Sequence, residues 1–172
     1  MNFRAKDDIE TMASEVISTR EWALPDETAT TALAGALAAV LDTGLVLYLH
    51  GPLGAGKTSF ARALLTALGV GERVKSPTYT LLESYTAAGR PAWHLDLYRI
   101  ADPDELEWLG LDALVDPAAL ILVEWAERGL GALPAADVAL YLDYAGNGRR
   151  ASLRSCSTRG EQVLARLRKF DA

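Results

Sequence analysis

The sequence predicts an α/β fold with parallel strands at its centre, antiparallel hairpins at its edges and helices on its faces. Residues 45–49 and 120–123 are short, unbroken apolar runs, as expected of parallel strands that are covered on both faces. A glycine-rich loop and then a helical pattern follow the first run, which is the strand–loop–helix order of an α/β unit. Two further pairs of strand-like segments are joined by short turn sequences, and these predict the hairpins.

The first half of the chain places two helices around the first buried run. Residues 21–24 form a short strand candidate, and Asp26 is a predicted N-cap. The helix after Asp26 has an apolar face with helical spacing, formed by Leu33, Leu37, Val40 and Leu41. The helix after the glycine-rich loop has the same kind of face, formed by Ala61, Leu64, Leu65 and Leu68, and Gly69 predicts its end.

The second half predicts two hairpins on either side of the second buried run. Asp102, Pro103 and Glu105 have the spacing of a capped helix start, because proline suits the first helical position and Glu105 can complete a capping box. The other predicted elements are a loop at 70–79, strands at 80–85 and 92–98, a loop at 126–136, strands at 138–144 and 149–156, and a last helix. For that helix, Thr158 and Glu161 predict a capping box, and Val163, Leu164, Leu167 and Phe170 predict the buried face.

Length and composition predict one domain, residues 21–172, preceded by an extension at 1–20 that has no clear period. Cys156 is the only cysteine of the 172 residues, so an internal disulfide bond is excluded. Neither a run of 18 apolar residues nor a signal-peptide pattern is present. We therefore expect a cytoplasmic protein without membrane association.

The charge is unevenly distributed along the chain. The net charge of −6 disfavours a free-standing nucleic-acid binder. Residues 149–172 nevertheless hold 7 Lys and Arg against 2 Asp and Glu, whereas residues 1–148 hold 10 against 21. The basic tail predicts either a solvated last helix, with cations that suit its dipole, or a surface for RNA, a nucleotide or an acidic partner.

Residues 51–58 carry the most specific chemistry of the chain. They read Gly-Pro-Leu-Gly-Ala-Gly-Lys-Thr and fit G-x-x-x-x-G-K-[ST], so the predicted fold is P-loop NTPase-like. Such a loop holds a polyphosphate with backbone N–H groups, and Gly54 and Gly56 allow positive φ and close approach of the ligand. Lys57 is placed to reach the β- and γ-phosphates, and Thr58 to bind Mg²⁺. We therefore expect ATP and Mg²⁺ as ligands.

A phosphate loop needs a carboxylate near the metal, and two acids follow strand-like segments. Glu124 directly follows the apolar run 120–123, and Asp96 lies within Trp-His-Leu-Asp-Leu-Tyr-Arg. Either acid could bind the metal directly or through water, while the other orients the attacking water. The sequence leaves this division of roles open.

Other residues near these motifs have two readings. Trp125 is either a packed aromatic or a residue for partner contact or gating. Ser76 and Thr78 are candidates for a switch that responds to the γ-phosphate, or they form an ordinary Ser/Thr-Pro turn. His50 and His94 lack metal-ligand spacing to a second histidine or cysteine, which predicts packing or hydrogen bonding and not a zinc site.

Taken together, these motifs resemble one family. Gly51–Thr58 followed by Ser59 and Phe60, Lys75–Thr80, His94–Arg99 and Val123–Trp125 occur in the order seen in the TsaE (YjeE) family. The phosphate loop is generic to many NTPases, whereas the other three segments are far more specific in combination. The resemblance covers roughly residues 21–170 and does not extend to residues 1–20.

The resemblance implies the ATPase subunit of the bacterial machinery that makes threonylcarbamoyladenosine in tRNA. Such a protein hydrolyses ATP weakly alone, acts with TsaD and TsaB, contacts tRNA only through that complex, and resets the complex by hydrolysis. Lys57, Asp96 and Glu124 would be catalytic, Thr58, Asp96 and Glu124 would hold the metal, and Trp125 would be functionally important, in addition to the switch candidates Ser76 and Thr78. The implied nucleotide-binding residues are Glu27, Gly51, Leu53, Gly54, Ala55, Gly56, Lys57, Thr58, Ser59 and Arg149.

Three other functions share the phosphate loop. A small-molecule or nucleoside kinase usually carries an arginine-bearing lid over the phosphates, and no such lid is recognisable between Asp96 and the C-terminus, where arginines such as Arg99 and Arg128 are scattered. A regulatory GTPase commonly reads guanine with Asn-Lys-x-Asp, which this chain lacks. A module that binds ATP without hydrolysing it would not need two well-placed acids.

Overall fold

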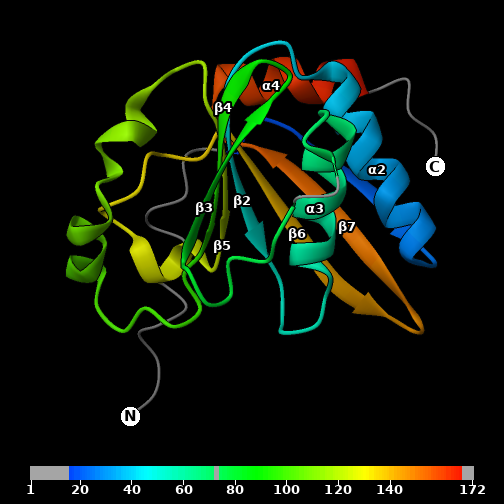
Figure 1. Cartoon of the computed structure of the whole chain (residues 1–172). Coiled ribbons are helices and arrows are strands. Elements are labelled where there is room, and N and C mark those ends of the chain that lie inside the picture. Colours follow the sequence, from blue (N-terminus) through cyan, green and yellow to red (C-terminus); the bar gives the residue numbers. More distant parts are fainter. Residues whose placement is uncertain (1–15, 72–73, 168–172) are drawn as a thin grey trace.

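The structure, a computed structural model, describes residues 16–71 and 74–167. Its centre is a seven-stranded sheet with the order β1-β7-β6-β2-β5-β4-β3 (Figure 1). In chain order the strands are β1 (Thr19–Leu24), β2 (Leu45–His50), β3 (Leu82–Ala87), β4 (Arg90–Asp96), β5 (Leu120–Glu124), β6 (Val138–Ala145) and β7 (Gly148–Ser155).

The middle of the sheet is parallel and its outer parts are antiparallel. β2 pairs in parallel with β5 on one side and β6 on the other, and β4 pairs in parallel with β5. The hairpins β3–β4 and β6–β7 are antiparallel, as is the pairing of β1 with β7. The α/β fold with a parallel centre and hairpins at the edges is confirmed. The parallel part contains more strands than the two buried runs predict, because β4 and β6, the inner strands of the two hairpins, also pair in parallel with their neighbours.

Three α-helices gather over one part of the sheet: α2 (Glu27–Val40), α3 (Lys57–Ala67) and α4 (Thr158–Arg166) (Figure 1). Leu45, Leu47 and Leu49 of β2 are buried in one core cluster with Leu33 of α2 and Phe60 of α3. Because side chains alternate along a strand, the remaining β2 residues belong to the opposite face. That face carries the second cluster.

The second cluster lies beneath short 3₁₀ helices: η2 (Pro103–Leu109), η3 (Leu111–Val115) and η4 (Ala126–Gly129). Ile121 and Val123 of β5 are buried there with Leu106 and Leu114. Every residue of β5 is therefore buried, as its unbroken apolar run predicts. The capping box of Asp102 and Glu105 is present, but the helix that it begins is 3₁₀ and not α.

Two helix starts show where the sequence is sufficient and where it is not. The Asp26 carboxylate accepts from the Ala29 N–H at 2.9 Å, which confirms this N-cap. The predicted cap of the last helix is wrong by one residue, since Ser157 and not Thr158 accepts from the Gly160 N–H. The Ser157 hydroxyl also donates to Asp137 at 2.6 Å, and this contact selects it over its neighbour. Phe170 lies outside the described residues.

The N-terminal boundary lies slightly earlier than the sequence indicates. β1 begins at Thr19, and the Ser18 and Ser155 hydroxyls lie 2.9 Å apart, so the last residues of the expected extension join the sheet. Residues 1–15 lie outside the described residues. Among the helices that the structure describes, none is long and apolar enough to cross a membrane.

Candidate nucleotide-binding site

The glycine-rich loop lies between the end of β2 and the start of α3, at the carboxyl edge of the parallel strands. Gly56 is the N-cap of α3 with φ 103°, a left-handed conformation that favours glycine. A Cβ atom on Gly51 would lie 2.3 Å from the carbonyl oxygen of Leu142, so this position has no room for a side chain. The loop therefore keeps its backbone close to the sheet and presents the N-terminus of α3 to a ligand.

Lys57 lies buried at the first position of α3. Its ammonium donates to the carbonyl oxygens of Gly51 at 2.6 Å and Pro52 at 3.1 Å, and lies 4.2 Å from the ring centre of Trp125. Burial lowers the pKa of Lys57, while the charge of Glu124 opposes this. No carboxylate in the described ranges forms an ion pair with it. The site thus holds a cation whose partners are neutral, which suits an incoming anion.

Glu124 is the centre of a buried hydrogen-bond cluster at the end of β5. The Thr58 hydroxyl lies 2.9 Å from both of its carboxylate oxygens. Nε2 of His94 lies 2.8 Å from Oε1 of the same carboxylate, and the His94 side chain is fully buried. The carboxylate is therefore held in place from two sides, by α3 and by β4.

Asp96 ends β4 beside Glu124, its register partner on β5. Its carboxylate accepts from the Tyr98 N–H at 3.1 Å. Burial raises the pKa of Asp96, and the nearby charge of Glu124 raises it further. Two acids on adjacent parallel strands thus face the same hydroxyl-bearing helix start. Hydroxyl and carboxylate oxygens of this kind are the ligands that Mg²⁺ prefers.

A cavity of about 360 Å³ connects these groups. Its lining joins the loop, both acids and the residues after β4 and β5: Leu53, Gly54, Gly56, Lys57, Thr58, Ser59, Thr78, Asp96, Tyr98, Arg99, Glu124 and Trp125. Most of the predicted site residues therefore meet in one place. The donor set, a loop N-terminus with a buried lysine next to a hydroxyl and two carboxylates, fits a magnesium–polyphosphate ligand.

Four of the predicted nucleotide-binding residues lie outside this lining. Gly51 and Ala55 belong to the loop itself, with Ala55 buried in the first core cluster, and Glu27 is exposed in the first turn of α2. Arg149 donates to the carbonyl oxygens of Ala55 and Gly54, each at 3.2 Å. It therefore braces the loop from the β6–β7 hairpin.

The predicted switch residues divide in the same way. Thr78 lines the cavity and Ser76 does not, and their hydroxyl groups are hydrogen-bonded to each other. Arg99, another cavity residue, lies over the exposed ring of Tyr79 at 5.0 Å. The segment after α3 thus brings a hydroxyl group to the cavity, and the segment after β4 brings a guanidinium.

Trp125 has φ 58°, a left-handed conformation that is costly for a bulky residue. It turns the chain directly after Glu124 and brings the indole ring over Lys57 and within 5.0 Å of the Tyr98 ring centre. Strained backbone of this kind clusters at functional sites, and here it holds the indole ring at the wall of the cavity.

Sequence reasoning missed two contributions to this site. It assigned His94 to packing or hydrogen bonding without identifying Glu124 as its partner. The available signal was its position two residues before Asp96, which places both side chains on one face of β4. Tyr98, the other missed residue, lies in the His94–Arg99 segment that carries the family resemblance, but its role in the cavity was not identified there.

The comparisons with known proteins agree with this geometry. The family model described as threonylcarbamoyl adenosine biosynthesis protein TsaE matches residues 24–152. A Haemophilus influenzae relative, tRNA threonylcarbamoyladenosine biosynthesis protein TsaE, is 41% identical over 124 residues, which are 72% of this chain and 78% of the relative. Its Bacillus subtilis namesake is 34% identical over 152 residues, covering 88% and 95% respectively.

A solved structure shows the same fold. The crystal structure of Bacillus subtilis YdiB superposes with a TM-score of 0.74 at 29% identity, covering 90% of this chain and 97% of that one. The family model spans the phosphate loop, both acids and Trp125. From these matches over most of its length, the chain belongs to the TsaE family of threonylcarbamoyladenosine biosynthesis proteins.

Proposed function

We propose that this protein is a Mg²⁺-dependent ATPase that acts in the cytoplasm with TsaD and TsaB to modify tRNA with threonylcarbamoyladenosine. ATP hydrolysis resets the TsaB–TsaD complex between turnovers, and tRNA is reached only through that complex. The observation that carries the ATPase assignment is the Thr58–Glu124 contact at 2.9 Å beside the buried Lys57. A hydroxyl and an acid at this position in a phosphate loop are the groups that hold Mg²⁺ near the γ-phosphate.

Each residue has a defined task in this proposal. Lys57 binds the β- and γ-phosphates by exchanging its carbonyl partners for phosphate oxygens. Thr58 contributes its hydroxyl to the metal site, where bound Mg²⁺ would neutralise charge on the phosphates. Glu124 and Asp96 hold the metal site and orient the attacking water, and His94 fixes the rotamer of Glu124 through its 2.8 Å contact.

The isolated subunit should hydrolyse ATP only weakly, because the arginine side chains near the cavity are engaged in other contacts. Hydrolysis needs positive charge for the transition state, and an arginine finger can accelerate it by roughly 10³–10⁵-fold. Arg99 lines the cavity but lies over Tyr79, and Arg149 is engaged by loop carbonyls. We therefore expect a partner to supply or position the missing cation.

The decisive experiment measures phosphate release from Mg·ATP with and without purified TsaB and TsaD. We expect stimulation by the partners and a loss of about 100-fold or more in Lys57→Ala and Glu124→Ala, which remove groups that stabilise transition-state charge or water. Arg62→Ala and Glu107→Ala are matched controls, because both side chains are exposed outside the cavity.

Two results would contradict the proposal. Phosphate release that the partners leave unchanged would remove the link to the TsaB–TsaD complex. Transfer of the γ-phosphate to a small acceptor, with no free phosphate, would indicate a kinase instead.

A further inference from the structure

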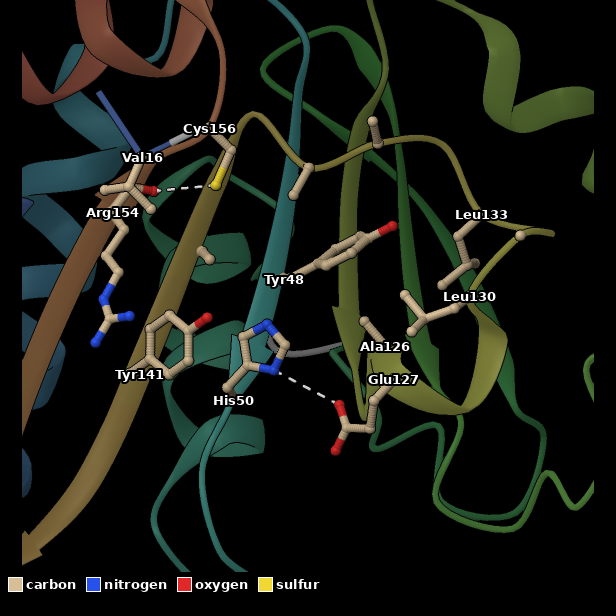
Figure 2. A pocket seen from close by; sticks show the side chains of 14 residues that line it. Val16, Tyr48, His50, Ala126, Glu127, Leu130, Leu133, Tyr141, Arg154 and Cys156 are labelled. Carbon is tan, nitrogen blue, oxygen red and sulfur yellow. Dashed lines mark hydrogen bonds and ion pairs between the residues drawn. The ribbon is translucent and has the colours of Figure 1, made fainter. Parts of the chain in front are cut away.

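A second hollow, the groove, has a volume of about 280 Å³ and lies on the sheet face opposite α2 and α3 (Figure 2). Tyr48 and His50 of β2 point into it, whereas Leu47 and Leu49 between and beside them pack in the helix-covered core. The groove shares no lining residue with the nucleotide cavity. It is therefore a separate feature that the proposed ATPase activity does not use.

The groove is mostly apolar, with the Arg154 guanidinium at one end and the His50–Glu127 pair between that end and the apolar wall. Leu130 and Leu133 form one wall, and the His50 ring stacks on Tyr141 with centroids 4.7 Å apart. At the other end the Arg154 guanidinium lies 4.1 Å from the ring centre of Tyr141. No carboxylate within residues 16–71 or 74–167 forms an ion pair with Arg154. An occupant that fits would carry apolar side chains and a negative charge.

The chain itself enters at this groove. Val16, the first described residue, lines the groove and is 45% exposed, and Figure 2 shows it beside Arg154 and Cys156. The following residue, Ile17, is fixed to β7 by its N–H bond to the Ser155 carbonyl at 3.1 Å. The fifteen residues that precede Val16 therefore start at the rim of the groove.

The composition of residues 1–15 matches both ends of the groove. The apolar residues Met12 and Ile9 precede Val16 by four and seven residues. Even a fully extended chain of seven residues spans at most about 25 Å, so Ile9 lies within that distance of Val16 at the rim of the groove. The segment also supplies four acids for the basic end: Asp7, Asp8, Glu10 and Glu15.

We propose that residues 1–15 dock in the groove of the same molecule, with Ile9 and Met12 against its apolar wall and an acidic side chain beside Arg154. The docked segment covers the part of this sheet face that lies over β2, β6 and β7, on the side opposite α2, α3 and α4. The groove also borders the nucleotide site, because His50, which lines the groove, directly precedes the phosphate loop. Nδ1 of His50 lies 3.5 Å from Oε2 of Glu127, another groove residue. The groove is thereby an intramolecular docking site that adjoins the loop.

The single cysteine is a natural reporter for this docking. Cys156 lines the groove, so its rate of reaction with a chromogenic thiol reagent measures how well the groove is covered. The experiment compares the full-length wild-type protein with the full-length double variant Ile9→Asp/Met12→Asp. We expect labelling about five-fold faster or more in the double variant, because losing even one buried apolar contact changes the docked population by that factor.

Controls separate docking from other causes. Val115→Asp changes an exposed apolar residue outside the groove and should label at the wild-type rate. A peptide of residues 1–16 should slow labelling of the double variant, and a scrambled peptide should not. Equal rates for wild type and the double variant would overturn the proposal. Protection of Cys156 from labelling that increases with protein concentration would also overturn the proposal, because it would show that a second copy of the chain occupies the groove.

Discussion

The contact between His94 and Glu124 gives the sharpest test of how the acid is positioned. Nε2 of His94 lies 2.8 Å from Oε1 of Glu124, and both side chains are buried. Nδ1 of His94 has no hydrogen-bond partner among the described residues, so the ring is held through Nε2 alone. Glutamine can present its amide nitrogen where Nε2 lies, whereas the shorter asparagine reaches only the position of Nδ1.

The expected loss follows from the chemistry of the contact. A hydrogen bond to a charged group is worth about 1.5–3 kcal/mol, and its removal here leaves a buried carboxylate with one partner fewer. In a domain of this size 1 kcal/mol changes the melting temperature by about 2–4 °C. His94→Asn should therefore lower the melting temperature by about 3–12 °C, and His94→Gln by clearly less.

Thermal unfolding monitored by circular dichroism measures the stability, and phosphate release under saturating Mg·ATP measures the effect on the site. His94→Gln should retain more of both properties than His94→Asn. Equal losses in the two variants would refute the reasoning, since they would show that ring packing and not the Nε2 contact holds Glu124.

Three further predictions concern the loop and the second acid. Gly51→Ala should destabilise the protein by about 1–3 kcal/mol through backbone strain and steric overlap, whereas Gly35→Ala in α2, with open space around it, should stabilise it by about 0.5–1 kcal/mol; chemical denaturation measures both. Arg149→Ala should weaken ATP binding by about five-fold or more through the loss of its two bonds to loop carbonyls, and the exposed neighbour variant Arg150→Ala should not, as a fluorescence titration would show. Asp96→Asn should raise the melting temperature at neutral pH without Mg²⁺. The folded state raises the pKa of Asp96 and so holds its proton more tightly than the unfolded chain, which makes stability fall as pH rises from the ordinary value of 3.8 through the folded pKa. A pH series in which Asp96→Asn and wild type differ equally at pH 3 and pH 7 would contradict this.

The strength of local patterns decided how much the sequence could predict. The buried run before Glu124 and the loop around Lys57 are determined by neighbouring residues, so their strands, helix and cavity agree with expectation. The His94–Glu124 partnership depends on the register of two parallel strands that are far apart in the chain, and no local pattern encodes that register. The role of Arg149 as a brace was hidden for the same reason, because it depends on how the β6–β7 hairpin meets the loop.

The other differences between the predicted and observed structure arise where two local conformations suit the sequence equally well. Ser157 and Thr158 are equally good caps by composition, and only the distant Asp137 carboxylate distinguishes them. The segment after Asp102 has a correct helix start, yet it continues as a 3₁₀ helix that packs Leu106 onto the second cluster. In both places tertiary contacts, and not propensity, settle the outcome.

The pairing of β1 with β7 has a consequence for how the protein is made. Arg20 of the first strand pairs with Leu153 of the last one, so the first strand has no neighbour in the sheet until nearly the whole chain exists. At a synthesis rate of about 5–20 residues per second, that delay is on the order of ten seconds. During this time the phosphate loop also lacks the Arg149 brace, which lies on the same late strand. The nascent chain should therefore gain its affinity for nucleotide only near the end of translation.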